Sequence, residues 1–132
     1  MSGASMNNET IENELRRIAQ IIGAKSDQLP TVCRLQGGGR PNIEISDEGI
    51  LSYEAYERGI QIFCYTFTDL DALMYHVFKE VVPQLASVYA TEMEANGEEF
   101  RKHFFRKKVE LMASVTAEWG KRMDEEQKEE PY

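Results

Sequence analysis

The sequence predicts an α+β domain, in which one helix is followed by an antiparallel meander of about four strands and then by two or three helices. Three observations support this prediction. Apolar residues recur at helical spacing over residues 9–22, short apolar runs alternate with turn residues over residues 29–67, and helical spacing returns from Thr68 onward. The turns between the runs are too short for crossover helices, which favours antiparallel strands. The later helices are expected to pack on one face of the sheet.

The first helix is predicted from one apolar face and a glycine stop. The face consists of Ile11, Leu15, Ile18, Ala19 and Ile22. Acidic residues favour its first half, and Gly23 follows its last turn. Residues 1–8 are expected to form a flexible tail, residues 9–123 a single α+β domain, and residues 124–132 an acidic, frayed tail.

Four short runs are predicted to be strands, at residues 32–36, 42–46, 50–56 and 60–67. Their connections are a glycine-rich loop, a tight turn and a hairpin tip, formed in order by Gly37-Gly38-Gly39-Arg40-Pro41, Asp47-Glu48-Gly49 and Glu57-Arg58-Gly59. Because side chains alternate along a strand, Glu54 and Tyr56 share one face of the third run, and Tyr53, Ala55 and Glu57 share the other.

The chain after the fourth run is predicted to be helical. Thr68 and Asp71 are spaced like a capping box. A long apolar stripe follows, made of Leu70, Leu73, Met74, Val77, Phe78, Val81, Leu85 and Val88. Pro83 removes a backbone donor and is expected to kink or divide this helix, which Asn96-Gly97 ends.

Two further helices are predicted near the C-terminus. The first opens at Glu98-Glu99 and ends before Thr116, with Phe104 and Phe105 on its buried stripe. The second begins near Thr116. Its Trp119 either anchors the helix in the core or faces a partner, and the sequence leaves both alternatives open.

Composition limits the class of partner. The 132 residues carry a formal net charge of -8, which disfavours nucleic acid and anionic membranes and favours either a cationic partner or plain solubility. The chain lacks a secretion signal and any apolar run approaching the ~20 residues of a membrane span. Cys33 and Cys64 allow one disulfide, but they are expected to be buried free thiols in a reducing compartment. A soluble, cytoplasmic protein is therefore predicted.

No catalytic or cofactor site is predicted. His76 with Glu80, and Glu99 with His103, have the spacing of paired metal ligands, but a metal site needs three or four ligands and the chain has only two histidines. No serine or cysteine lies in a nucleophile motif, and the glycine-rich loop lacks the Lys-Ser/Thr of a phosphate loop. The basic segment 101–108 is interpreted as a solvated helix face.

The predicted contact surface is the last hairpin. Tyrosine and arginine dominate binding hot spots, so the candidates for partner binding are Tyr53, Glu54, Tyr56, Glu57 and Arg58, with Asp69 and Asp71 as second choices. Two alternatives stay open. Tyr53 or Tyr56 packs in the core while Glu57-Arg58 merely closes a turn, or Arg58 forms an internal salt bridge with Asp69 or Asp71.

A family resemblance covers about two-thirds of the chain, from Ser46 to the C-terminus. The residues that carry it are Gly49, Tyr53, Tyr56, Glu57-Arg58-Gly59, Thr68-Asp69-Leu70-Asp71, Leu73, Phe78, Phe100-Arg101, Glu110-Leu111, Trp119 and Arg122. In these residues the chain resembles the immunity proteins of bacterial polymorphic toxin systems, specifically the immunity protein 63 family.

The resemblance implies a non-enzymatic protein that is made beside a secreted toxin and neutralises it by tight stoichiometric binding. A toxin that acts on nucleic acid presents a basic cleft, to which an acidic inhibitor would be steered. Two rival classes remain: a self-associating structural module, and a small enzyme or nucleotide-binding domain that uses the glycine loop and carboxylates. The neighbouring open reading frame discriminates among them, because a toxin gene should lie there.

Overall fold

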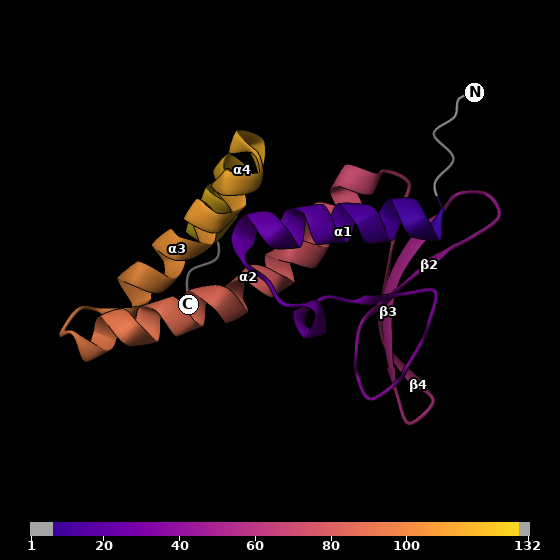
Figure 1. The fold of residues 1–132 in the computed structure, drawn as a ribbon, viewed down its shortest axis with the longest axis horizontal. Helices are drawn as coiled ribbons and strands as arrows, with labels where there is room; N and C mark the ends of the chain where they lie inside the picture. Colours follow the sequence, from indigo (N-terminus) through magenta and orange to yellow (C-terminus); the bar gives the residue numbers. More distant parts are fainter. Residues whose placement is uncertain (1–6, 130–132) are drawn as a thin grey trace. The chain divides into compact units, whose positions relative to one another are not determined.

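A computed structural model describes residues 7–129 (Figure 1). Its elements are α1 (Asn8–Ile22), a 3-10 turn (Ser26–Gln28), β1 (Thr31–Val32), β2 (Asn42–Ile45), β3 (Leu51–Glu57), β4 (Ile60–Phe67), α2 (Leu70–Ala95), α3 (Phe100–Val115) and α4 (Ala117–Glu129). The predicted α+β class is confirmed. Of the predicted tails, residues 1–6 and 130–132 lie outside the described residues, whereas α1 begins at Asn8 and α4 continues to Glu129.

The described residues divide into two compact units. We call residues 7–19 and 25–77 the sheet unit, and residues 20–24 and 78–129 the helical unit; the boundary falls inside α2. The prediction of a single domain over residues 9–123 stays a prediction. The predicted packing of the later helices on one face of the sheet is wrong for α3 and α4, which belong to the helical unit. No helix among residues 7–129 is long and apolar enough to cross a membrane.

The first helix has the predicted boundaries and the predicted buried face. The Thr10 amide donates a hydrogen bond of 2.9 Å to Oδ1 of Asn7, which caps the start of α1. Ile11, Leu15, Ile18, Ala19 and Ile22 are all buried, which confirms the predicted face.

The sheet has the order β1-β2-β3-β4, and its pairs β2–β3 and β3–β4 are antiparallel as predicted. The prediction of an all-antiparallel meander is wrong at its first strand, because β1 pairs with β2 in parallel. Cys33 adopts a left-handed φ of 51°, which ends β1 after two residues. Residues 33–41 then return the chain to the end of the sheet where β1 began, so both strands run in the same direction.

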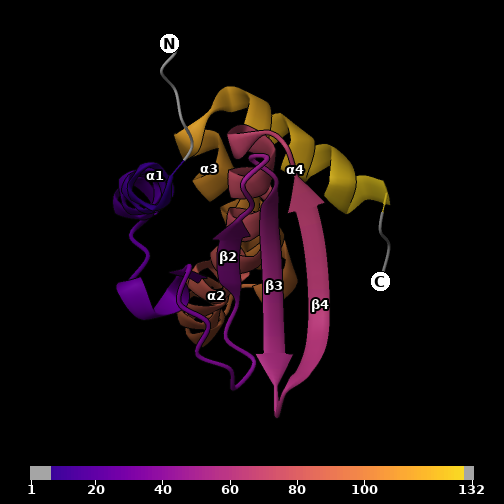
Figure 2. The same ribbon diagram turned by 90° about the vertical axis from the view of Figure 1, so that its right-hand side faces the viewer.

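One face of the sheet carries the core of the sheet unit. Leu51, Tyr53 and Ala55 of β3 are buried, and the residues between them are not. This alternation confirms the predicted division of β3 into two faces. In Figure 1, α1 and the first turns of α2 lie on the same side of the sheet, and Figure 2 shows β4 as its outermost strand.

The second helix is a single helix that contains Pro83 and is not divided there. Its cap is Asp69 instead of the predicted Thr68, because the helix begins one residue later. Oδ2 of Asp69 accepts a hydrogen bond of 3.0 Å from the Ala72 amide. Asn96-Gly97 ends the helix as predicted, with Gly97 at a φ of 88°.

The buried stripe of α2 differs from the prediction in its second half. Val88 is 62% exposed, and the buried row instead runs through Val82, Ala86 and Ala90. The prediction followed the large apolar side chains, whereas the buried row of the second half includes the small side chains of Ala86 and Ala90.

The helical unit ends with two helices, α3 and α4. Thr116 caps α4, because its Oγ1 accepts a hydrogen bond of 3.0 Å from the Trp119 amide. Trp119 is 3% exposed, with its ring centroid 6.4 Å from that of Phe78. Of the two alternatives for Trp119, the structure therefore supports the core anchor.

Candidate functional site

The β3–β4 hairpin ends in a two-residue turn. Glu57 pairs with Ile60, and Arg58 and Gly59 between them have φ values of 54° and 77°. Positive φ at both central residues is typical of a type I′ turn, whose twist matches that of the flanking strands. The predicted hairpin tip is confirmed, and Arg58 is held at its outermost point by the backbone.

Glu54 and Tyr56 lie together on the face of the sheet opposite the core. Nε2 of Gln61 in β4 donates a hydrogen bond of 2.9 Å to the Tyr56 hydroxyl and lies 3.4 Å from Oε1 of Glu54. Glu57 and Arg58 are exposed beside them. We call Glu54, Tyr56, Glu57 and Arg58 the hairpin surface.

A second carboxylate acts on the hairpin surface electrostatically. Partial burial raises the pKa of Glu54, and the charge of Glu44 on the neighbouring strand raises it further. Glu44 is itself held by Asn42, whose Nδ2 donates a hydrogen bond of 2.8 Å to Oε2 of Glu44. Two carboxylates thus share this face, and a cation placed between them would relieve their repulsion.

Tyr53 lies on the opposite face and is 2% exposed. Its ring centroid is 5.4 Å from that of Phe63 and 5.3 Å from that of His76. The ring of His76 also contacts Tyr65 and Phe67 of β4. Tyr53 therefore belongs to an aromatic cluster that joins the sheet to α2, and sequence reasoning missed this cluster because its members are far apart in the chain.

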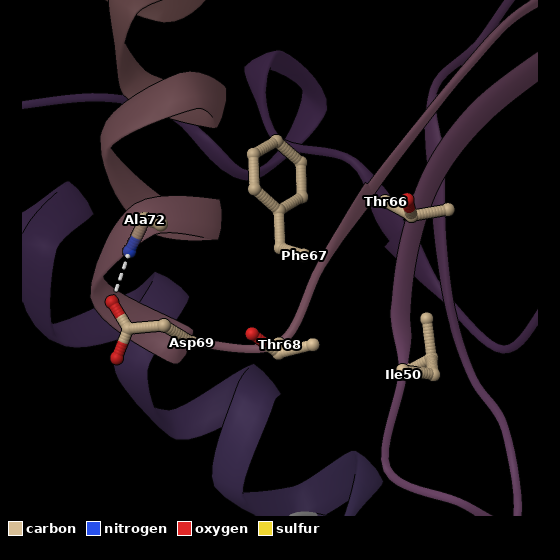
Figure 3. Close-up of a pocket in the computed structure, with 6 residues that line it drawn as sticks. All are labelled: Ile50, Thr66, Phe67, Thr68, Asp69 and Ala72. Carbon is tan, nitrogen blue, oxygen red and sulfur yellow. Dashed lines mark hydrogen bonds between the residues drawn. The ribbon is translucent and has the colours of Figure 1, made fainter.

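Asp69 and Asp71 lie away from the hairpin surface. The tip precedes β4 and Asp69 follows it, and the eight residues of β4 span about 25 Å. Arg58 is therefore too far from Asp69 or Asp71 for the alternative salt bridge. Near Asp69 an open pocket of about 340 Å³ is lined by Ile50, Thr66, Phe67, Thr68, Asp69 and Ala72, and Figure 3 shows the Asp69 cap at its rim.

The remaining polar groups do not assemble a metal centre in the part of the chain that the structure describes: no three His, Cys, Asp or Glu side chains there could hold an ion together. The side chain of His103 contacts Glu98, with Nε2 2.7 Å from Oε1. Both thiols are free. The prediction that both are buried is wrong, because Cys64 is exposed on the outer strand.

The basic segment of α3 also differs from its prediction. Phe104 and Phe105 are half-buried instead of buried, and their rings contact each other at a centroid distance of 5.3 Å. Nζ of Lys108 lies 4.6 Å and 4.7 Å from the two ring centroids. Adjacent residues of a helix point about 100° apart, so one buried stripe cannot take both rings, and the Lys108 ammonium lies over them in cation–π contacts.

The sequence model of one protein family, immunity protein 63, matches residues 47–129, which is more than half of the chain. The chain belongs to the immunity protein 63 family. The match begins in the β2–β3 turn of this immunity protein and includes β3, β4 and the three C-terminal helices. Membership implies a toxin as the partner and a role in binding. No curated protein and no solved structure matches the chain significantly.

Proposed function

We propose that this protein neutralises a cognate secreted bacterial toxin by tight stoichiometric binding in the cytoplasm, with no covalent chemistry of its own. The observation that carries the proposal is the family match over residues 47–129. The matched segment includes the whole hairpin surface. A non-enzymatic inhibitor binds through a surface that is complementary to its partner and needs no reactive group. The hairpin surface, with its tyrosine and charged side chains, is suited to such binding.

The proposed contact residues are Glu54, Tyr56, Glu57 and Arg58, with Asp69 and Asp71 in second place. Tyr53 is left out of the contact because it is buried, and it supports the hairpin from behind. The tight turn presents Glu57 and Arg58 in a single backbone conformation. Such preorganisation strengthens binding, because less conformational freedom is lost when the complex forms.

The negative charge of this protein favours a partner with a basic surface. The whole chain carries -8, and residues 41–77 hold seven carboxylates and one cation, Arg58. A toxin that acts on nucleic acid has a basic cleft for the phosphate backbone. Carboxylates of the hairpin surface would be attracted to that cleft and would exclude the substrate from it.

Co-expression with the toxin domain encoded by the adjacent open reading frame tests the proposal. The wild-type protein should rescue growth. Glu57→Lys should weaken toxin binding about 10- to 100-fold and lose the rescue, because it reverses a charge at the centre of the contact. Glu48→Lys is the matched control, since Glu48 is an exposed glutamate in the turn at the opposite end of β3.

Circular dichroism should show that both variants fold like the wild type. Cells that die as readily with the wild-type protein as without it would show that the proposed immunity function is wrong. Equal rescue by Glu57→Lys and Glu48→Lys would show that the hairpin surface is not the contact.

A further inference from the structure

The outer strand of the sheet has a free edge. β4 pairs with β3 on one side only, and within residues 7–129 no strand pairs with its other side. Figure 2 shows β4 running along this side of the sheet. An edge strand presents unpaired N–H and C=O groups outward, and about four of the eight residues of β4 point both of these groups away from β3.

Residues 63–67 of this edge lack the features that usually prevent strand pairing. Ile60–Phe67 contains no charged residue and no proline. Its one register shift lies near the tip, opposite Ala55 and Tyr56, and residues 63–67 pair regularly with β3. Ile60, Ile62 and Tyr65 are 71%, 53% and 48% exposed. A long, uncharged and partly apolar edge is typical of sheets that accept a further strand.

The groups beside this edge select the charge of the added strand. Glu54 lies next to β4, with its Oε1 4.0 Å from Sγ of Cys64, and Glu44 lies close enough to raise the pKa of Glu54. Asp69 and Asp71 follow the far end of β4. A second copy of this chain would pair through its own β4, which has no charged side chain to offset these carboxylates, whereas a strand with lysine or arginine would neutralise them.

We infer that residues 63–67 of β4 accept a strand of the toxin by backbone pairing, and that this strand alternates basic with apolar side chains. Its basic side chains would lie on the outer face toward Glu54, which is one strand in from the edge, and its apolar side chains would continue the aromatic row of Phe63 and Tyr65 on the inner face. This inference rests on the proposed function and names the part of the toxin that binds.

Amide hydrogen exchange measures the pairing directly. The purified protein is studied alone and with the toxin domain encoded by the adjacent reading frame. Outward amides within residues 63–67 should exchange at least about tenfold more slowly in the complex, because they become hydrogen-bonded. An interface limited to the hairpin tip would leave these amides unchanged.

Substitutions at Thr66, an exposed residue of the regular segment, test the charge of the partner strand. Thr66→Lys should weaken toxin binding about tenfold or more, because a cation on the edge repels a basic strand. Thr66→Glu perturbs the same position and should weaken binding less than about threefold, because its charge is complementary. Thr91→Lys and Thr91→Glu, on an exposed position of α2, are the matched controls and should bind like the wild type.

The outcomes separate this inference from the proposed function. A wild-type protein that does not bind the toxin domain overturns both. A wild type that binds without protection of residues 63–67, or a Thr66→Lys variant that binds as tightly as the wild type, overturns the strand pairing alone. Concentration-dependent protection of these amides without toxin, together with a dimer in sedimentation, identifies a second copy as the occupant and also overturns it.

Discussion

Arg58 occupies a backbone conformation that L-residues with a Cβ atom rarely adopt. Its φ of 54° lies in the left-handed region, which costs such residues roughly 1–2 kcal/mol relative to their usual conformations. Glycine or asparagine is the usual residue at this position of a type I′ turn. A strained arginine at an exposed tip agrees with the proposed use of its guanidinium in binding.

Replacement of Arg58 should separate stability from binding. Arg58→Gly should raise the free energy of unfolding by about 0.5–1 kcal/mol, because the relief of strain exceeds the entropy cost of glycine. The same variant should bind the toxin domain more weakly. Urea unfolding and calorimetric titration measure the two effects. Arg58→Asn should also raise the free energy of unfolding and weaken toxin binding. A loss of stability in both variants would show that the backbone at Arg58 is not strained.

The carboxyl of Glu54 makes stability depend on pH. Its pKa is raised in the folded state, first by burial and then by Glu44, so the folded protein holds this proton more tightly than the unfolded chain does. The resulting stabilisation is complete below the ordinary pKa of 4.5 and is lost as pH rises through the folded pKa. At neutral pH the ionised carboxylate therefore destabilises the fold.

Glu54→Gln should consequently raise the thermal midpoint at pH 7, because glutamine keeps the shape without the charge. The gain should shrink as the pH falls through the raised pKa of Glu54 toward 4.5, and it should stay constant below 4.5, where Glu54 is protonated in both the folded and the unfolded state. Thermal unfolding at several pH values measures this difference. Glu48→Gln at the exposed turn is the control, and a gain for Glu54→Gln that is independent of pH would contradict the electrostatic explanation.

At the scale of elements, α3 and α4 cross at a position that requires glycine. A Cβ atom on Gly120 would lie 2.5 Å from Cβ and 2.8 Å from Cα of Ala113. Both distances are shorter than van der Waals contact, and the backbone of α3 would have to move. Gly120 is thus present for close packing, although glycine weakens a helix interior.

Gly120→Ala should destabilise the protein by about 1–3 kcal/mol, because the clash outweighs the better helix propensity of alanine. At an open helix position the same change would stabilise. Ala113→Gly removes the atom that the new Cβ meets, so the double variant should recover part of the loss. Denaturant unfolding of the two single variants and the double variant measures this coupling. Strictly additive effects would show that the two residues do not meet.

At the scale of the whole molecule, the net charge predicts how fast the proposed basic partner associates. With a net charge of -8, the protein should attract a basic toxin over distances up to the Debye length. The association rate should therefore fall about tenfold between about 20 mM and about 500 mM salt, while the dissociation rate changes less. Stopped-flow kinetics measures both rates. An association rate independent of salt would contradict a basic partner surface.

Sequence alone determined the features that depend on neighbouring residues. The apolar face of α1, the tip at Arg58-Gly59 and the alternation of β3 each follow from spacing or turn chemistry within a few positions, and the structure has all three. The same local rules placed Glu54 and Tyr56 together. The proposed contact surface could therefore be outlined without coordinates.

Only the tertiary structure decided the direction in which a strand pairs and which side chains of an element are buried. The parallel pairing of β1, the burial of Tyr53 beside His76 and the half-exposed Phe104 depend on residues distant in sequence. Periodicity identifies the two faces of an element, but the partners that cover a face are brought there by the fold. For the same reason the free edge of β4 became apparent only once the strand order was known.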